Sequence, residues 1–308
     1  MRIATMATGA VGGYFGARLA AAGNDVHFIA RGAQLDAIRK NGLRIESTLG
    51  DLHIKDAKAT DNPASVGAVD VVLFAVKLWD TEKAAELARP LIGPQTRLIT
   101  FQNGVDSVER LAPLLGTDHA IGGTAHVASV IASPGVVRHT SQFARLRFGR
   151  IDGQPDAMLS RFTEAGKAAG IDIAASSEIN VERWKKFVFL SSLAGATSAT
   201  RQPLGNILSD FDTRAFFFNL MREVIAVARA KKVALPETFL DEQTKFAEAA
   251  PRTMKASMAH DLERGNRLEL DWLTGTVVTL GRELKVPTPT SEAVYAVLKP
   301  HRLGAPQV

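Results

Sequence analysis

Short apolar runs alternate with longer segments of helical periodicity through the first part of the chain. Glycine and polar residues separate these segments, as expected for turns. The spacing predicts helices over 10–23 and 81–89. Four short, largely apolar runs predict strands over residues 2–7, 25–30, 69–76 and 96–101. The last two, rich in β-branched residues, are typical of buried parallel strands. Strands and helices in alternation predict an α/β fold.

Predicted strands continue through the first half of the chain, and helices dominate after it. Alternating segments over 120–148, broken at Pro134-Gly135, predict further strands, after a hairpin pair at 43–45 and 52–54. Beyond residue 177 helical periodicity dominates. We therefore predict an α/β dinucleotide-binding (Rossmann-type) domain over 1–177 and an all-helical domain over 178–308.

A glycine turn joins the first predicted strand to the first helix, in the segment Ala7-Thr8-Gly9-Ala10-Val11-Gly12. Gly9 would allow the backbone close to a pyrophosphate, and Gly12 would let the helix pack closely on its strand. The N–H groups at the helix start, including those of Ala10 and Val11, would bind the phosphates. Ala7 replaces the first glycine of the usual fingerprint, and a buried alanine/glycine helix is the alternative interpretation.

Arg31 directly follows the second predicted strand, where NAD-specific sites commonly place an acid for the ribose hydroxyls. A guanidinium attracts a 2′-phosphate and stacks on adenine, so the sequence favours NADP(H). An ordinary surface arginine is the alternative.

Polar residues also follow the next two predicted strands. Lys77 ends one of them, and Asn103 lies just past the end of the other. Ligands bind at the carboxyl edge of open α/β sheets, which makes both residues candidates for the site. For Asn103, which precedes a glycine, a simple turn role is the alternative.

Composition excludes several function classes. The chain has 308 residues, 46% hydrophobic and 22% charged, and no cysteine. The net charge of +5 is dispersed among acidic residues, which argues against nucleic acid as a partner. The seven histidines show no short metal-ligand spacing, so we expect no metal. Without a membrane-spanning segment or a signal peptide, we expect a cytoplasmic protein and a small-molecule substrate.

The chain resembles the ketopantoate reductase (2-dehydropantoate 2-reductase) family over nearly its whole length. The motifs that carry the resemblance are the glycine turn, Phe101-Gln102-Asn103-Gly104-Val105, Pro134-Gly135-Val136-Val137-Arg138-His139-Thr140, and Trp184 with Lys186. The resemblance implies NADPH-dependent reduction of a 2-oxo acid to a 2-hydroxy acid, such as 2-dehydropantoate to pantoate in pantothenate biosynthesis.

The resemblance also implies roles for particular residues. Lys186 matches the general acid, and Glu269 matches a carboxylate beside the lysine and the substrate hydroxyl. Asn103, Ser257 and Glu269 match substrate ligands. The cofactor ligands implied by the turn and the resemblance are Gly9, Ala10, Val11, Gly12, Arg31, Lys77 and Asn103.

Three positions depart from the family pattern, because Leu190, Ala194 and Leu204 replace asparagines that bind ketopantoate. The loss of each asparagine would weaken ketopantoate binding by about 1 to 3 kcal/mol if its hydrogen-bond partner on the substrate stays unpaired. A relative that reduces a less polar 2-oxo acid therefore remains open. An imine or opine-type reductase, a β-hydroxyacid dehydrogenase, a non-enzymatic NADP(H) sensor and a homodimeric assembly also remain open.

Overall fold

The computed structural model describes residues 1–305 and divides into two compact units. Unit 1 comprises Met1–Gln102 and Asp106–Ile179, and unit 2 comprises Asn103–Val105 together with the chain from Asn180 onward. The last three residues of the predicted second domain, 306–308, lie outside the described part.

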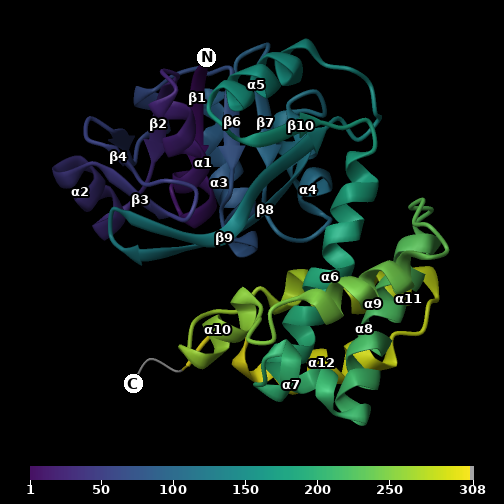
Figure 1. The fold of residues 1–308 in the computed structure, drawn as a ribbon. Coiled ribbons are helices and arrows are strands. Elements are labelled where there is room, and N and C mark those ends of the chain that lie inside the picture. The colour runs from purple at the N-terminus through teal and green to yellow at the C-terminus, as the bar shows by residue number, and fades with distance from the viewer. Residues whose placement is uncertain (306–308) are drawn as a thin grey trace. The chain divides into compact units, whose positions relative to one another are not determined.

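Unit 1 is built on one sheet of ten strands (Figure 1). Nine strands follow the order β4-β3-β9-β8-β7-β6-β1-β2-β5, and β10 pairs with β9. The strands are β1 (Arg2–Met6), β2 (Asp25–Ile29), β3 (Leu43–Ser47), β4 (Leu52–Ile54), β5 (Lys58–Thr60), β6 (Val71–Phe74), β7 (Arg97–Thr100), β8 (Ala120–Ser133), β9 (Val136–Gly149) and β10 (Asp172–Ala175).

The centre of this sheet is parallel. β1 pairs in parallel with β2 on one side and β6 on the other, so Ile29 and Phe74 both lie opposite Met6. The chain first extends the sheet from β1 through β2 to β5, and later extends it the other way through β6 and β7. This reversal beside β1 is the point at which open α/β sheets bind ligands.

A long hairpin forms the other part of the sheet. β8 and β9, of 14 residues each, pair antiparallel across the predicted Pro134-Gly135 turn. Gly135 has φ +79°, a conformation that glycine adopts without strain. The hairpin pairs with β3 and β10 through β9, so the mixed sheet extends beyond its parallel centre.

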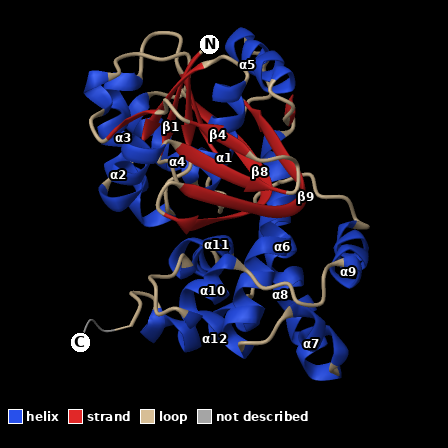
Figure 2. Ribbon diagram, turned by 60° about the vertical axis from the view of Figure 1, so that its left-hand side comes forward, coloured by secondary structure: helices blue, strands red, loops and turns tan. Residues whose placement is uncertain are grey.

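Five α-helices belong to unit 1 (Figure 2). Buried aliphatic and aromatic side chains on both faces of the sheet form two clusters that include Phe28 and Phe74. The helices are α1 (Ala10–Ala21), α2 (Gly32–Asn41), α3 (Thr81–Ala88), α4 (Ser107–Leu115) and α5 (Ala157–Ala168). The pattern analysis did not predict α4 or the short strand β5.

Unit 2 contains only helices among its described residues, as predicted (Figure 2). One apolar core that includes Trp184, Phe217 and Leu270 joins them. Buried Glu223 accepts hydrogen bonds from the backbone N–H groups of Thr290 and Ser291, which caps the last α-helix. The α-helices are α6 (Ile179–Thr200), α7 (Leu204–Ser209), α8 (Phe211–Ala230), α9 (Phe239–Ala249), α10 (Ser257–Glu263), α11 (Thr274–Leu284) and α12 (Pro289–Leu298). No helix within residues 1–305 is long and apolar enough to cross a membrane.

Candidate active site

The turn after β1 is fixed to the neighbouring strand by a threonine that the sequence analysis did not select. The backbone N–H of Thr8 donates to the Ile29 carbonyl at 2.8 Å, and its hydroxyl donates to the same oxygen at 3.0 Å. The side-chain amide of Gln34, a residue of α2, donates to the Thr8 carbonyl at 3.2 Å. The loop that precedes α1 is therefore held in place before any ligand arrives.

The glycines of this turn have different roles. A Cβ on Gly12 would clash with the Ala7 carbonyl oxygen, and a Cβ on Gly16 would lie 2.6 Å from Thr5 and 2.9 Å from Phe28. Both glycines therefore allow α1 to pack against the turn and the sheet. A Cβ on Gly9 would meet nothing within 4 Å, so the protein's own packing does not require glycine there. The open space beside Gly9 fits the predicted approach of a pyrophosphate.

The start of α1 provides the donors for such a group. Gly9 is the N-cap residue, with Ala10 and Val11 following it, and the first turn contains no acidic side chain. First-turn N–H groups of an α-helix lack intrahelical acceptors, and the helix dipole favours negative charge there. These residues fit the phosphates of a dinucleotide.

Arg31 and Lys77 lie just beyond the carboxyl ends of β2 and β6, the two strands that flank β1. Arg31 is 74% exposed, and its guanidinium donates to the Asp80 carboxylate at 2.9 Å. The Lys77 ammonium lies 5.5 Å from the centre of the Trp79 ring. The fold thus brings the glycine turn and both predicted cofactor ligands to one edge of unit 1.

Gln102 organises the same edge, although the sequence analysis gave it no role of its own. Its side-chain amide donates to the Val76 carbonyl at 3.1 Å and to the Thr81 hydroxyl at 2.8 Å. It also accepts a hydrogen bond from Thr100 at 3.0 Å. Gln102 therefore links the ends of β6 and β7 and the start of α3.

Asn103 and Lys186 meet within unit 2. The Lys186 ammonium, on α6, donates to the Asn103 side-chain oxygen at 3.1 Å. Asn103 reaches this position because Gly104 after it has φ +87°, which turns the chain sharply. The two residues were predicted for one site from separate parts of the sequence, and the structure brings them into contact.

The environment of Lys186 changes its acidity. Burial lowers the pKa of Lys186 from 10.5 to about 8, and the negative charge of Glu269 opposes that shift. Glu269 is itself only 6% exposed. A partly buried lysine with a carboxylate acting on it is the arrangement expected of a proton donor that works near neutral pH.

A buried arginine holds the Asn103 segment. Arg183, one turn before Lys186 on α6, donates to the Val105 carbonyl at 2.6 Å. Trp184 between them is a core residue that packs edge-on against Phe187, with ring centroids 5.6 Å apart. The Trp184–Lys186 motif therefore combines a packing residue with a polar one, and Arg183 positions the loop that carries Asn103.

The remaining predicted substrate residues have different surroundings. Ser257 is the exposed first residue of α10, and its predicted role stays a prediction. Ala194 and Leu204 are 0% and 1% exposed in the core of unit 2. Of the three departures from the family pattern, only Leu190 is partly exposed. Among these three positions, Leu190 is therefore the one at which a side chain could make a substrate pocket less polar than the family's asparagine does.

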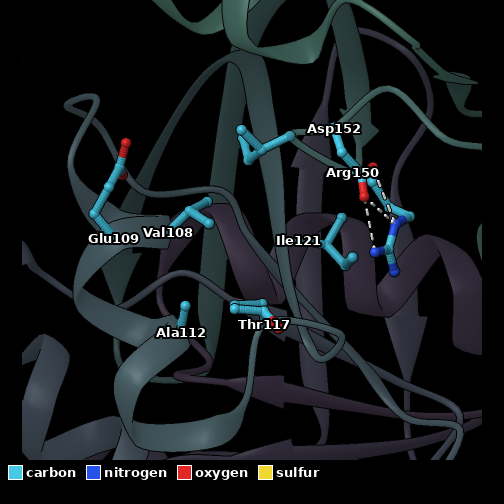
Figure 3. Close-up of a pocket in the computed structure, with 9 residues that line it drawn as sticks. Val108, Glu109, Ala112, Thr117, Ile121, Arg150 and Asp152 are labelled. Atoms are coloured by element: carbon cyan, nitrogen blue, oxygen red, sulfur yellow. Dashed lines mark hydrogen bonds and ion pairs between the residues drawn. The ribbon is translucent and has the colours of Figure 1, made fainter.

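Unit 1 also has a hollow with a different lining. This cavity has a volume of about 380 Å³. Val108 and Ala112 of α4 and Ile121 of β8 are among the residues that line it (Figure 3). Arg150 at its rim forms ion pairs with Asp118 and Asp152. None of the predicted site residues lines this cavity. Within residues 1–305, no group of three or more histidine, aspartate and glutamate side chains could hold a metal ion.

Comparison with known families decides the identity of the fold. The family model described as Ketopantoate reductase PanE/ApbA matches residues 3–153, and its C-terminal counterpart matches residues 178–302. The chain belongs to the ketopantoate reductase family. This confirms the predicted family and fold class. The family assignment makes the chain an oxidoreductase with a nicotinamide dinucleotide cofactor.

Individual relatives cover nearly the whole chain. A 2-dehydropantoate 2-reductase of Mesorhizobium japonicum is 31% identical in an alignment of 320 positions that covers 97% of each chain. A crystal structure of a PanE/ApbA family ketopantoate reductase from Ralstonia eutropha is 32% identical, with a TM-score of 0.90 and 98% of each chain covered. D-mandelate dehydrogenase, solved with NADH and anilino(oxo)acetate, covers 98% of each chain with a TM-score of 0.89. At 19% identity, that likeness shows the fold alone.

Proposed function

We propose that this chain reduces a 2-oxo acid to a 2-hydroxy acid with NADPH, and that Lys186 is the general acid. The observation that carries the proposal is the Lys186 ammonium, bonded to Asn103 and with its pKa lowered to about 8. Such a group still carries its proton at pH 7 and gives it up more readily than an exposed lysine does.

The cofactor would supply the hydride to the keto carbon. Gly9, Ala10 and Val11 would bind its pyrophosphate, Arg31 would bind its 2′-phosphate, and Lys77 would lie beside the cofactor. Negative charge that develops on the substrate oxygen would be stabilised by the Lys186 ammonium, which then donates the proton. Glu269 keeps that ammonium charged, and Asn103 orients it.

The substrate is proposed to be 2-dehydropantoate or a less polar 2-oxo acid. The similarity to 2-dehydropantoate 2-reductases supports the first, and Leu190 on the same helix face as Lys186 supports the second. A leucine offers no hydrogen bond to a substrate hydroxyl, so an apolar side chain on the 2-oxo acid would suit it better.

A panel of substrates tests the proposal. NADPH oxidation is measured with 2-dehydropantoate, 2-oxoisovalerate, phenylpyruvate and benzoylformate, and with a 2-oxo acid plus an amine. We expect reduction of at least one 2-oxo acid without an amine, with phenylpyruvate or benzoylformate reduced at least as efficiently as 2-dehydropantoate. Reduction only in the presence of an amine would point to an imine reductase, and no turnover despite NADPH binding would favour a sensor.

A further inference from the structure

The Arg31–Asp80 ion pair lies where a dinucleotide-binding unit distinguishes its cofactors. Arg31 follows β2 and Asp80 lies just beyond the end of β6, and these strands flank β1 on either side. The guanidinium and the carboxylate meet at 2.9 Å, with the Asp80 side chain 30% exposed. A negative group thus accompanies the arginine that the proposed function assigns to a 2′-phosphate.

The position of Asp80 is fixed by its surroundings. It ends a short 3-10 turn, Leu78–Asp80, in which its backbone N–H donates to the Lys77 carbonyl at 2.9 Å. The Leu78 carbonyl accepts from the Arg110 guanidinium at 2.8 Å and from the Thr81 hydroxyl at 2.9 Å. This bonded turn holds the Asp80 carboxylate near Arg31.

The charges of the two cofactors differ where this pair lies. NADPH carries a 2′-phosphate, which a carboxylate repels and which must compete with Asp80 for Arg31. NADH has a 2′-hydroxyl there, and a carboxylate accepts a hydrogen bond from it, as the acid at the end of the second strand does in NAD-specific sites. Asp80 therefore opposes the preference that Arg31 alone would give.

We propose that Asp80 is a cofactor-specificity residue that narrows the preference for NADPH, so that this chain uses NADH as well. The inference rests on the proposed function, since it takes the cofactor's adenosine end to lie at Arg31. In the NADPH complex Arg31 leaves Asp80 for the phosphate, whereas in the NADH complex the ion pair persists.

Direct binding measurements test this without turnover. Dissociation constants for NADPH and NADH, and for 2′,5′-ADP and 5′-ADP as fragments, are measured by calorimetry on the wild type and on Asp80→Asn. The matched control is Glu86→Gln on α3, the helix that follows Asp80. This variant also removes one negative charge, from the exposed ion pair between Glu86 and Arg89. Asp80→Ser serves as a second variant if the asparagine disturbs the turn.

We expect Asp80→Asn to tighten NADPH and 2′,5′-ADP binding on the order of tenfold at low ionic strength, from Coulomb repulsion of a doubly charged phosphate. The effect should shrink in high salt. NADH and 5′-ADP should bind unchanged or more weakly, and Glu86→Gln should change neither cofactor. An unchanged ratio of the NADPH and NADH constants in both Asp80 variants would overturn the inference. A wild type that binds neither cofactor would instead overturn the proposed function.

Discussion

The two units hold their candidate residues on different kinds of scaffold. In unit 1 the candidates lie on loops and at a helix start beyond the carboxyl ends of parallel strands, where backbone N–H groups and short turns would bind the cofactor. In unit 2 Lys186 lies within a 22-residue helix, where burial lowers its pKa and the charge of Glu269 opposes that shift, while its ammonium donates a hydrogen bond to Asn103 from a distant segment. The first kind of site depends on backbone geometry, whereas the second depends on the dielectric surroundings of one side chain.

The largest expected effect separates chemistry from cofactor binding. Lys186→Ala should lower kcat by about 10²–10⁴-fold, because the lost proton and charge act mainly in the transition state. NADPH affinity, measured by fluorescence titration, should stay within about twofold, since the proposed phosphate donors lie in unit 1. Lys185→Ala, one residue away on the same helix, is the control and should retain activity. Equal losses in both variants would remove Lys186 from its proposed role.

Arg31→Ala should affect the cofactor more than the chemistry. We expect NADPH binding to weaken by about 1 to 3 kcal/mol, the range for losing a hydrogen bond to a charged group. NADH binding should change little, because its ribose lacks the phosphate. Calorimetric titration of both cofactors measures the difference, and an equal loss for the two would refute the assignment of Arg31.

A pair of glycine substitutions should distinguish ligand space from packing. Gly9→Ala adds a methyl group that meets nothing in the protein, so the melting temperature should stay the same while NADPH binding weakens by about 1–3 kcal/mol through crowding. Gly12→Ala places the methyl group against the Ala7 carbonyl and should destabilise the fold by a similar amount. Thermal unfolding and titration of both variants give the readout. Unaltered NADPH affinity in Gly9→Ala would show that no phosphate approaches there.

The smallest effect concerns the acidity of Lys186. Because the proposed acid acts in its protonated form, kcat for reduction should be flat at low pH and fall as pH rises through about 8, the pKa of Lys186. Glu269 raises that pKa, so Glu269→Gln should move the midpoint to lower pH. The pH profile of kcat measures both. A midpoint that stays in place would mean that another group controls the profile.

The sequence predicted unit 1 better than it predicted the contacts of unit 2. Apolar runs and glycines follow local rules, so β1, the turn at Gly9 and the ends of β6 and β7 were found from the pattern itself. Helical periodicity also predicted the all-helical unit. Nothing in that periodicity distinguishes Lys186 from Lys185, and resemblance to the family made the choice.

The residues that sequence reasoning missed depend on partners far along the chain. Thr8 acts through β2, and Gln102 acts through the end of β6. Asp80 becomes a candidate only because the fold brings it into contact with Arg31, which lies 49 positions earlier in the chain. A threonine, glutamine or aspartate after a strand is too common to select from sequence alone, and strand register decides which of them meet.

The membership of Asn103–Val105 in unit 2 affects how the protein can be dissected. Arg183 is buried and bonds the Val105 carbonyl across 78 positions of the chain. A fragment that starts at residue 178 would lack both that carbonyl and the amide that Lys186 bonds. Restoring the segment requires closing a long loop, whose entropic cost grows only slowly with length. A version of the helical unit that keeps both hydrogen bonds must therefore carry residues 103–105 as well as the chain from residue 180 onward.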